Sequence, residues 1–191
     1  MKQITSIIIV LLSCLNMSAQ SVTEYFEAGN PIKYCNTDFY LAWSAHQQEI
    51  YFVQEYLPQG ENLEHYNQIF TVSVIFCNGT PLEAVNAKIT ELEQRKKTDP
   101  VTNYTTAENN GEHILEFIVS DSNNGTINTV EVDIHHYKQV TINGRKACVL
   151  GFYSARAYGD DIMPFIQSIP EKRNEWYEGM SKLKLNPKFP K

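Results

Sequence analysis

Apolar and polar residues alternate with a period of two along much of this 191-residue chain, a pattern that predicts half-buried β-strands. The alternation is regular in residues 38–45 and 50–57, and the polar segment 46–49 between them predicts a hairpin loop. The apolar residues within 63–70 instead recur at helical spacing. They predict a short helix that passes into a further strand over 71–76.

Three Asn-Gly pairs divide the second half of the chain. Asn and Gly adopt the positive φ angles that tight hairpin turns need, so the pairs at 110–111, 124–125 and 143–144 predict an antiparallel meander. Its four strands are expected over residues 101–107, 113–120, 127–139 and 146–154.

Helices are expected on either side of this meander. Thr80 and Glu83 form a capping box around Pro81, and the apolar stripe that follows predicts a helix over 81–97. A further helical pattern after the last strand predicts terminal helices interrupted at Pro170. Together these elements predict an α+β domain, a largely antiparallel sheet layered with helices.

The amino-terminal residues have the pattern of an export signal. Lys2 precedes an apolar run over 4–12, which is shorter than the about 20 residues that a membrane-spanning helix needs. We expect residues 1–19 to be a signal peptide. The remaining residues, 20–191, then form a single domain with a short basic tail in solvent.

The segment Leu11-Leu12-Ser13-Cys14 supports an alternative, because it resembles the lipobox of bacterial lipoproteins. The lipoprotein signal then covers 1–13, and Cys14 becomes the acylated first residue. On either interpretation the protein is exported. We expect it in the periplasm or secreted, or held at the cell envelope by its lipid.

The composition is that of a folded, acidic domain. Apolar residues make up 42% of the chain and the formal net charge is −6, which excludes a disordered chain and disfavours binding to phosphate backbones. We therefore expect no nucleic-acid partner, and contact with a membrane only through a lipid at Cys14.

Three cysteines, Cys35, Cys77 and Cys148, remain after export, and no two of them have the spacing of a redox or zinc motif. One disulfide is compatible with an oxidising compartment, but the sequence does not select the pair.

No familiar catalytic or cofactor motif occurs in the sequence. The glycines form neither a dinucleotide fingerprint nor a phosphate loop. Ser154 lacks the flanking glycines of a hydrolase nucleophile elbow. We therefore expect no cofactor.

One strand of the meander nevertheless carries acid/base and metal-ligand types. Alternation places Glu131, Asp133 and His135 on one face. The Cα atoms of Glu131 and His135 are about 13 Å apart, so a metal site needs ligands from a neighbouring strand. His113 and Glu116 are the candidates for that role. The simpler interpretation is a solvent-exposed face whose charges keep the protein soluble.

Two segments resemble small exported bacterial proteins of unassigned function. These segments are Gln54 to Glu61 and Gly151 to Arg156, and Ser18-Ala19-Gln20 is similar to the signal-peptide ends of Bacteroidetes exported proteins. Such proteins are similar in plan to the PsbP-like fold, which is named for an extrinsic photosystem subunit. The resemblance implies an α/β/α sandwich with an accessory or binding role, and it supplies no functional residue.

The sequence thus favours an exported, non-enzymatic accessory or binding protein whose partner is an unidentified protein or small-molecule ligand. The alternative is a metal-dependent or acid/base hydrolase that uses the face of Glu131, Asp133 and His135. In either case His113 is the candidate that would complete the site.

The two export signals differ in the mature amino terminus. Intact mass spectrometry of the protein from its native host is expected to find an unmodified chain beginning at Gln20, because Ser18-Ala19 offers a signal-peptidase site. A chain that begins at an acylated Cys14 would contradict this and establish the lipoprotein.

Overall fold

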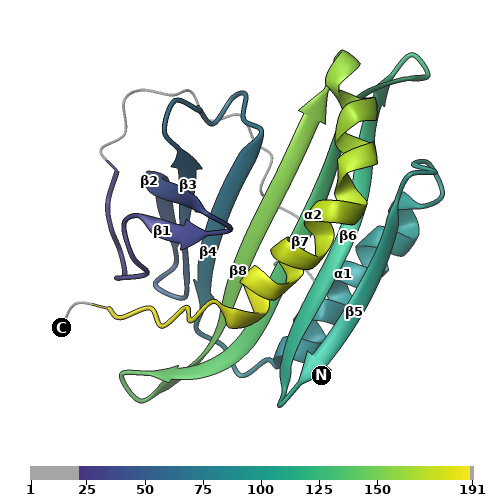
Figure 1. Ribbon diagram of the computed structural model, residues 1–191. Helices are drawn as coiled ribbons and strands as arrows, with labels where there is room; N and C mark the ends of the chain where they lie inside the picture. The colour runs from purple at the N-terminus through teal and green to yellow at the C-terminus, as the bar shows by residue number, and fades with distance from the viewer. Residues whose placement is uncertain (1–21, 190–191) are drawn as a thin grey trace.

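A computed structural model describes residues 22–189, and within them a single antiparallel sheet carries one helix on each face (Figure 1). The strands are β1 (Ile32–Tyr34), β2 (Thr37–Gln47), β3 (Tyr51–Pro58), β4 (Gln68–Ile75), β5 (Asn103–Asn109), β6 (Glu112–Asn123), β7 (Thr126–Ile142) and β8 (Arg145–Tyr158). The helices are α1 (Pro81–Arg95) and α2 (Ile162–Lys182), the latter preceded by the 3₁₀ turn η1 (Gly159–Asp161).

The strands follow the order β1-β2-β3-β4-β8-β7-β6-β5, and every neighbouring pair is antiparallel. The pairing of β4 with β8 joins the amino-terminal strands to the later meander. Figure 1 shows α2 in front of the curled sheet and α1 behind it. The predicted α+β layering is confirmed, whereas the finer PsbP-like sandwich stays a prediction.

The meander of β5 to β8 is confirmed together with its turns. Asn110, Asn124 and Asn143 have φ angles of 54°, 50° and 50°, and each is followed by a glycine of positive φ. Two consecutive positive φ angles define the turn that matches the twist of the flanking strands. Strands β6, β7 and β8 are longer than predicted, because pairing continues to the residues next to each turn, whereas β5 has the predicted length and begins two residues later.

The helix predicted within 63–70 is wrong. Asn62 Oδ1 accepts hydrogen bonds from the backbone N–H groups of Glu64 and His65, at 3.0 Å each, which closes a turn instead. The Glu61 carboxylate accepts two further backbone N–H groups at the start of β4. These side chains satisfy the backbone locally, so the chain leaves the turn in extended form.

Helix α1 begins as predicted. Thr80 Oγ1 accepts from the N–H of Glu83 at 3.2 Å, and the Glu83 carboxylate accepts from the N–H of Thr80 at 2.7 Å. The expected break at Pro170 is wrong, because α2 continues through it as one helix. Buried Trp176 and Met180 anchor the turns beyond the proline, and this packing outweighs the lost backbone hydrogen bond.

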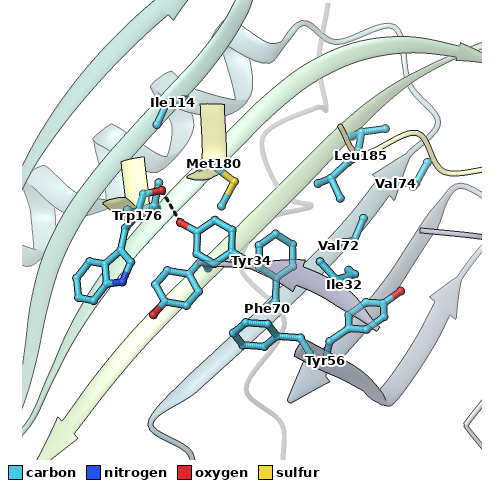
Figure 2. Packing of buried hydrophobic residues seen from close by; sticks show 14 of the residues in the cluster. Ile32, Tyr34, Tyr56, Phe70, Val72, Val74, Ile114, Trp176, Met180 and Leu185 are labelled. Carbon is cyan, nitrogen blue, oxygen red and sulfur yellow. Dashed lines mark hydrogen bonds between the residues drawn. The ribbon is translucent and has the colours of Figure 1, made fainter. Parts of the chain in front are cut away.

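The main core lies between α2 and the sheet (Figure 2). Tyr34 of β1 packs against Phe70 and Tyr153, with ring centroids 5.3 and 4.6 Å apart. Its hydroxyl donates a hydrogen bond of 2.6 Å to the backbone carbonyl of Trp176 in α2. The short strand β1, which the sequence analysis missed, is thereby tied to the helix.

The expected basic tail does not extend freely into solvent over 183–189. Leu185 is 2% exposed, and Phe189 packs against Phe26 and Phe52. The N–H of Glu27 donates to the carbonyl of Lys188 at 2.9 Å. The apolar residues between the lysines therefore hold this segment against the amino-terminal strands.

The contact between the tail and β8 depends on the missing side chain at Gly151. A methyl group there would overlap Leu185 Cδ1, so Gly151→Ala is expected to lower the free energy of unfolding by about 1–3 kcal/mol. Urea unfolding measures the change. In a double-mutant cycle, Gly151→Ala should cost less when Leu185 is already alanine. Additive effects of the two substitutions would contradict the proposed overlap.

Candidate functional site

Helix α1 covers the sheet face that carries the acidic and histidine residues of β7. Asp133 is only 4% exposed and His135 8%, so the expectation of a solvent-exposed face is wrong. The sequence pattern placed these residues correctly on one face of the strand. It did not show that α1, through buried Val85 and Leu92, packs on that same face.

A polar pocket of about 280 Å³ remains between α1 and strands β3, β4, β6, β7 and β8. Its floor is formed by sheet residues that share this face, because their strands are paired in register. The lining comprises Glu55, Tyr66, Ile69, Thr71, Lys88, Glu91, Leu92, Arg95, Phe117, Val119, Glu131, Asp133, His135, Phe152 and Ser154.

Two neighbouring carboxyl groups, Glu131 and Asp133, lie on the pocket floor. Burial and then the charge of Asp133 raise the pKa of Glu131 to about 8, although Arg156 opposes the shift. Burial likewise raises the pKa of Asp133, against a hydrogen bond donated by Ser154 Oγ. Since two like charges this close disfavour joint ionisation, the pair retains a proton above the usual carboxyl range.

Glu55 of β3 completes the acidic floor and differs from the other two. Glu131 is bonded to the Arg156 guanidinium and Asp133 to Ser154, whereas the Glu55 carboxylate makes no hydrogen bond or ion pair with another group of residues 22–189. Burial raises its pKa. Its carboxylate is therefore the acceptor that remains available to a molecule in the pocket.

His135 forms part of the wall and is not an exposed base. Its Nδ1 lies 2.9 Å from the Tyr137 hydroxyl, and its ring packs against Phe117 and Phe152. Burial lowers its pKa well below the ordinary histidine value, so the ring is neutral at pH 7. Its Nε2 is 3.8 Å from Asp133 Oδ1, too far for a good hydrogen bond.

The cations of α1 are bound to other acidic groups at the rim. Lys88 Nζ is 2.9 Å from Glu91. Arg95 donates to Asp99 and Asp121, at 3.2 and 2.7 Å. Burial alone would raise the pKa of Asp99, but its hydrogen bonds outweigh burial and lower that pKa to about 2. Both cations are thus engaged at the rim, and neither is bonded to the acidic floor.

Tyr66 closes the pocket from the loop before β4. The Arg156 guanidinium lies 4.4 Å from the centroid of its ring, so Tyr66 and Glu131 contact the same cation. Tyr66, Arg156 and Glu55 were not identified from sequence as site residues. Only the β3–β4–β8–β7 register brings their strands together.

The two residues expected to supply further metal ligands lie elsewhere. His113 faces Tyr137 near the other end of the same sheet face and does not line the pocket. Glu116 is on the opposite face, where Arg173 of α2 donates to it at 2.6 Å. Across residues 22–189, no three His, Cys, Asp or Glu side chains converge to hold a metal ion.

The cysteine predictions are resolved in part. Cys35, Cys77 and Cys148 are all free thiols in the structure. Cys14 and the expected signal segment 1–19 lie outside the described residues. In the described chain, no helix combines the length and apolar character needed to cross a membrane.

The raised pKa of the half-buried Glu55 carboxyl can be tested by measuring protein stability at two pH values. Because its pKa is higher in the folded than in the unfolded chain, its contribution favours folding at low pH and is lost as the pH rises through the folded value. Glu55→Gln is therefore expected to be more stable than the wild type at pH 8 and equally stable at pH 4. Urea unfolding at both pH values measures this.

Glu64→Gln, which alters an exposed carboxyl on the loop before β4, is the matched control and should change stability at neither pH. A Glu55→Gln variant that is less stable than the wild type at pH 8 would show that the carboxylate has a stabilising partner.

Comparison with known proteins found one family and one structure. The crystal structure of LpqN of Mycobacterium tuberculosis, described as involved in cell envelope biogenesis, matches 88% of this chain and 81% of LpqN at 12% identity. The TM-score of 0.35 is too low to establish a common fold. No curated protein matches the chain. The PsbP-like resemblance and the Bacteroidetes origin stay predictions.

A protein-family model matches residues 26–185, which include every described strand and helix. Because this match spans most of the chain, the protein belongs to that family, which is an uncharacterised one.

Proposed function

We propose that the protein is an exported, non-enzymatic binding protein that holds a small organic cation, such as a protonated amine, in the pocket between α1 and the sheet. The observation that carries this proposal is the Glu55 carboxylate, which lines the pocket without a protein partner. Glu55 is partly buried, so its carboxylate has lost part of its contact with water, and an ammonium group that donates to it offsets that loss.

The charges around the pocket favour a cation over an anion. Arg156, Lys88 and Arg95 are each bound to an acidic side chain, so no free positive charge is left to attract an anion among the described lining residues. The floor has the three carboxyl groups of Glu55, Glu131 and Asp133 against the single guanidinium group of Arg156, so acidic groups outnumber basic ones there. The local field therefore attracts positive charge.

The remaining lining supports a ligand with an apolar part. Phe117 and Phe152 form aromatic walls, and Ile69, Leu92 and Val119 contribute aliphatic surface. Aromatic faces attract cations as well as apolar groups. The volume of about 280 Å³ suits a molecule of a few to about fifteen heavy atoms.

Export and an accessory role rest on the amino-terminal pattern and on the family-level resemblance given by the sequence. The pocket between α1 and the sheet supplies the binding site that such a role requires. A soluble or envelope-held binding protein would use this pocket to capture a ligand outside the cytoplasm.

An acid/base hydrolase is the second candidate, since the Glu131–Asp133 pair retains a proton as general acids do. It ranks behind binding because Arg156 and Ser154 already occupy these two carboxyl groups. Ser154 donates to Asp133 and not to His135, so it lacks the serine–histidine hydrogen bond of the common hydrolase triads.

Isothermal titration with putrescine and lysine methyl ester, compared with acetate and glucose, tests the proposal. At least one amine is expected to bind, and Glu55→Gln should weaken that binding about 10- to 100-fold, the loss of one charge-assisted hydrogen bond. Binding should strengthen as the pH rises, because the Glu55 carboxyl must ionise.

Glu171→Gln on the exposed side of α2 is the control and should leave binding unchanged. Binding of acetate in place of the amines, or amine binding that Glu55→Gln leaves unaltered, would contradict the proposal. Turnover of model esters or glycosides that Asp133→Asn abolishes would favour the hydrolase.

A further inference from the structure

Strand β5 forms one edge of the sheet. Among residues 22–189 it pairs only with β6, and every residue of the strand except Tyr104 is exposed. A free edge presents unpaired N–H and C=O groups that can pair with another strand. The other edge, β1, is much shorter and carries Lys33 at its centre.

The hairpin geometry shows which groups of β5 point outward. Asn109 and Glu112 flank the two-residue turn and are register partners, and residues in that position form a hydrogen-bonded pair. Backbone hydrogen bonding to β6 then alternates along the strand, so the odd-numbered residues 103, 105 and 107 also bond to β6. The N–H and C=O groups of the even-numbered residues, Tyr104, Thr106 and Glu108, point away from β6.

An independent contact agrees with this assignment. The N–H of Tyr104 donates to the side-chain oxygen of Asn103 at 2.9 Å, as expected for a group that is not bonded to β6. The outward N–H and C=O groups of the β5 edge therefore alternate in a known pattern, and the Tyr104 N–H must exchange its bond to Asn103 for one to a partner strand.

Strand β5 also lacks the features that usually block edge pairing. Residues 103–109 contain no proline and no lysine, and their register with β6 has no bulge. Thr105 and Thr106 are of a β-branched type that favours extended structure. The described edge is thus without proline, lysine or a bulge, and Glu108 is its one charged residue.

The outward residues are complementary to a second copy of themselves. When two β5 strands pair antiparallel about a two-fold axis through Thr106, Thr106 faces its own counterpart and Tyr104 faces the partner's Glu108. Each outward residue then exchanges two backbone hydrogen bonds with its counterpart. No like charges face each other in this register.

The charges beside this edge are already balanced within each copy. Lys96 Nζ lies 4.3 Å from the centroid of the Tyr104 ring and is paired with Glu93 at 2.9 Å. The partner's Glu108, placed opposite Tyr104, therefore arrives beside a paired cation, and backbone hydrogen bonds are the main attraction between the two strands.

We propose that two copies of the chain associate through their β5 strands, antiparallel and centred on Thr106, into one continuous sheet. The contact is confined to a strand edge and a few side chains, so it belongs to the small and weak class of interface. This dimer does not depend on the proposed ligand.

Light scattering across a concentration series, up to about 1 mM because small interfaces are weak, tests the dimer. The wild type is expected to shift from monomer to dimer. Thr106→Pro removes the central outward N–H at a position where an edge strand tolerates proline, and should remain monomeric. Thr106→Val keeps that N–H and should dimerise like the wild type.

A wild type that is monomeric throughout the series, or a Thr106→Pro variant that dimerises equally well, would overturn the proposal. Circular dichroism establishes whether Thr106→Pro is folded, and disulfide trapping provides a readout that does not need this variant. The Cα atoms of facing Thr106 residues would be about 5.5 Å apart, within reach of a disulfide.

Thr106→Cys is therefore expected to form a covalent dimer on mild oxidation. Asn103→Cys is the control, because the two copies of residue 103 would lie about 20 Å apart. The wild type, with its native cysteines, sets the background for both variants. Trapping of Asn103→Cys in place of Thr106→Cys would show that the register is wrong.

Discussion

The antiparallel pairing of β4 with β8 is the constraint on which the site depends. It places β3 and β4, which carry Glu55 and Thr71, in the same sheet as β7 with its acidic pair. Neither half of the sheet contains the pocket by itself. Helix α1, which follows β4 directly, then covers this junction from one side and makes the floor a partly enclosed cavity.

Helix α1 shields the charged groups of that face from water, and most of these groups have a hydrogen-bond partner in the protein or are neutral. Arg156 bonds to Glu131, Ser154 bonds to Asp133, and His135 is kept neutral by burial. Glu55 is the exception. Its half-buried carboxylate lines the pocket without a hydrogen bond to residues 22–189, so a ligand in the pocket can supply a partner in place of water.

Local signals in the sequence predicted the local structure well. The Thr80–Glu83 capping box and the Asn-Gly turns determine their elements through neighbours a few residues away. The turn at Asn62 was mistaken for a helix because apolar spacing concealed its side-chain hydrogen bonds.

The remaining errors concern contacts between distant segments. Alternation placed Glu131, Asp133 and His135 on one face but contained no information on what covers it. Burial of that face by α1, and of Leu185 by the sheet, follows from tertiary packing. Glu55 was missed for the same reason, because its relation to β7 passes through two intervening strands.

The most direct test of the account is an NMR titration of the Glu55 carboxyl carbon, with and without a saturating amine. The account predicts a pKa above the ordinary glutamate range in the free protein, since burial is uncompensated, and a lower pKa when the amine is bound. An ordinary pKa that the amine leaves unchanged would contradict the claim that Glu55 is a ligand-binding group.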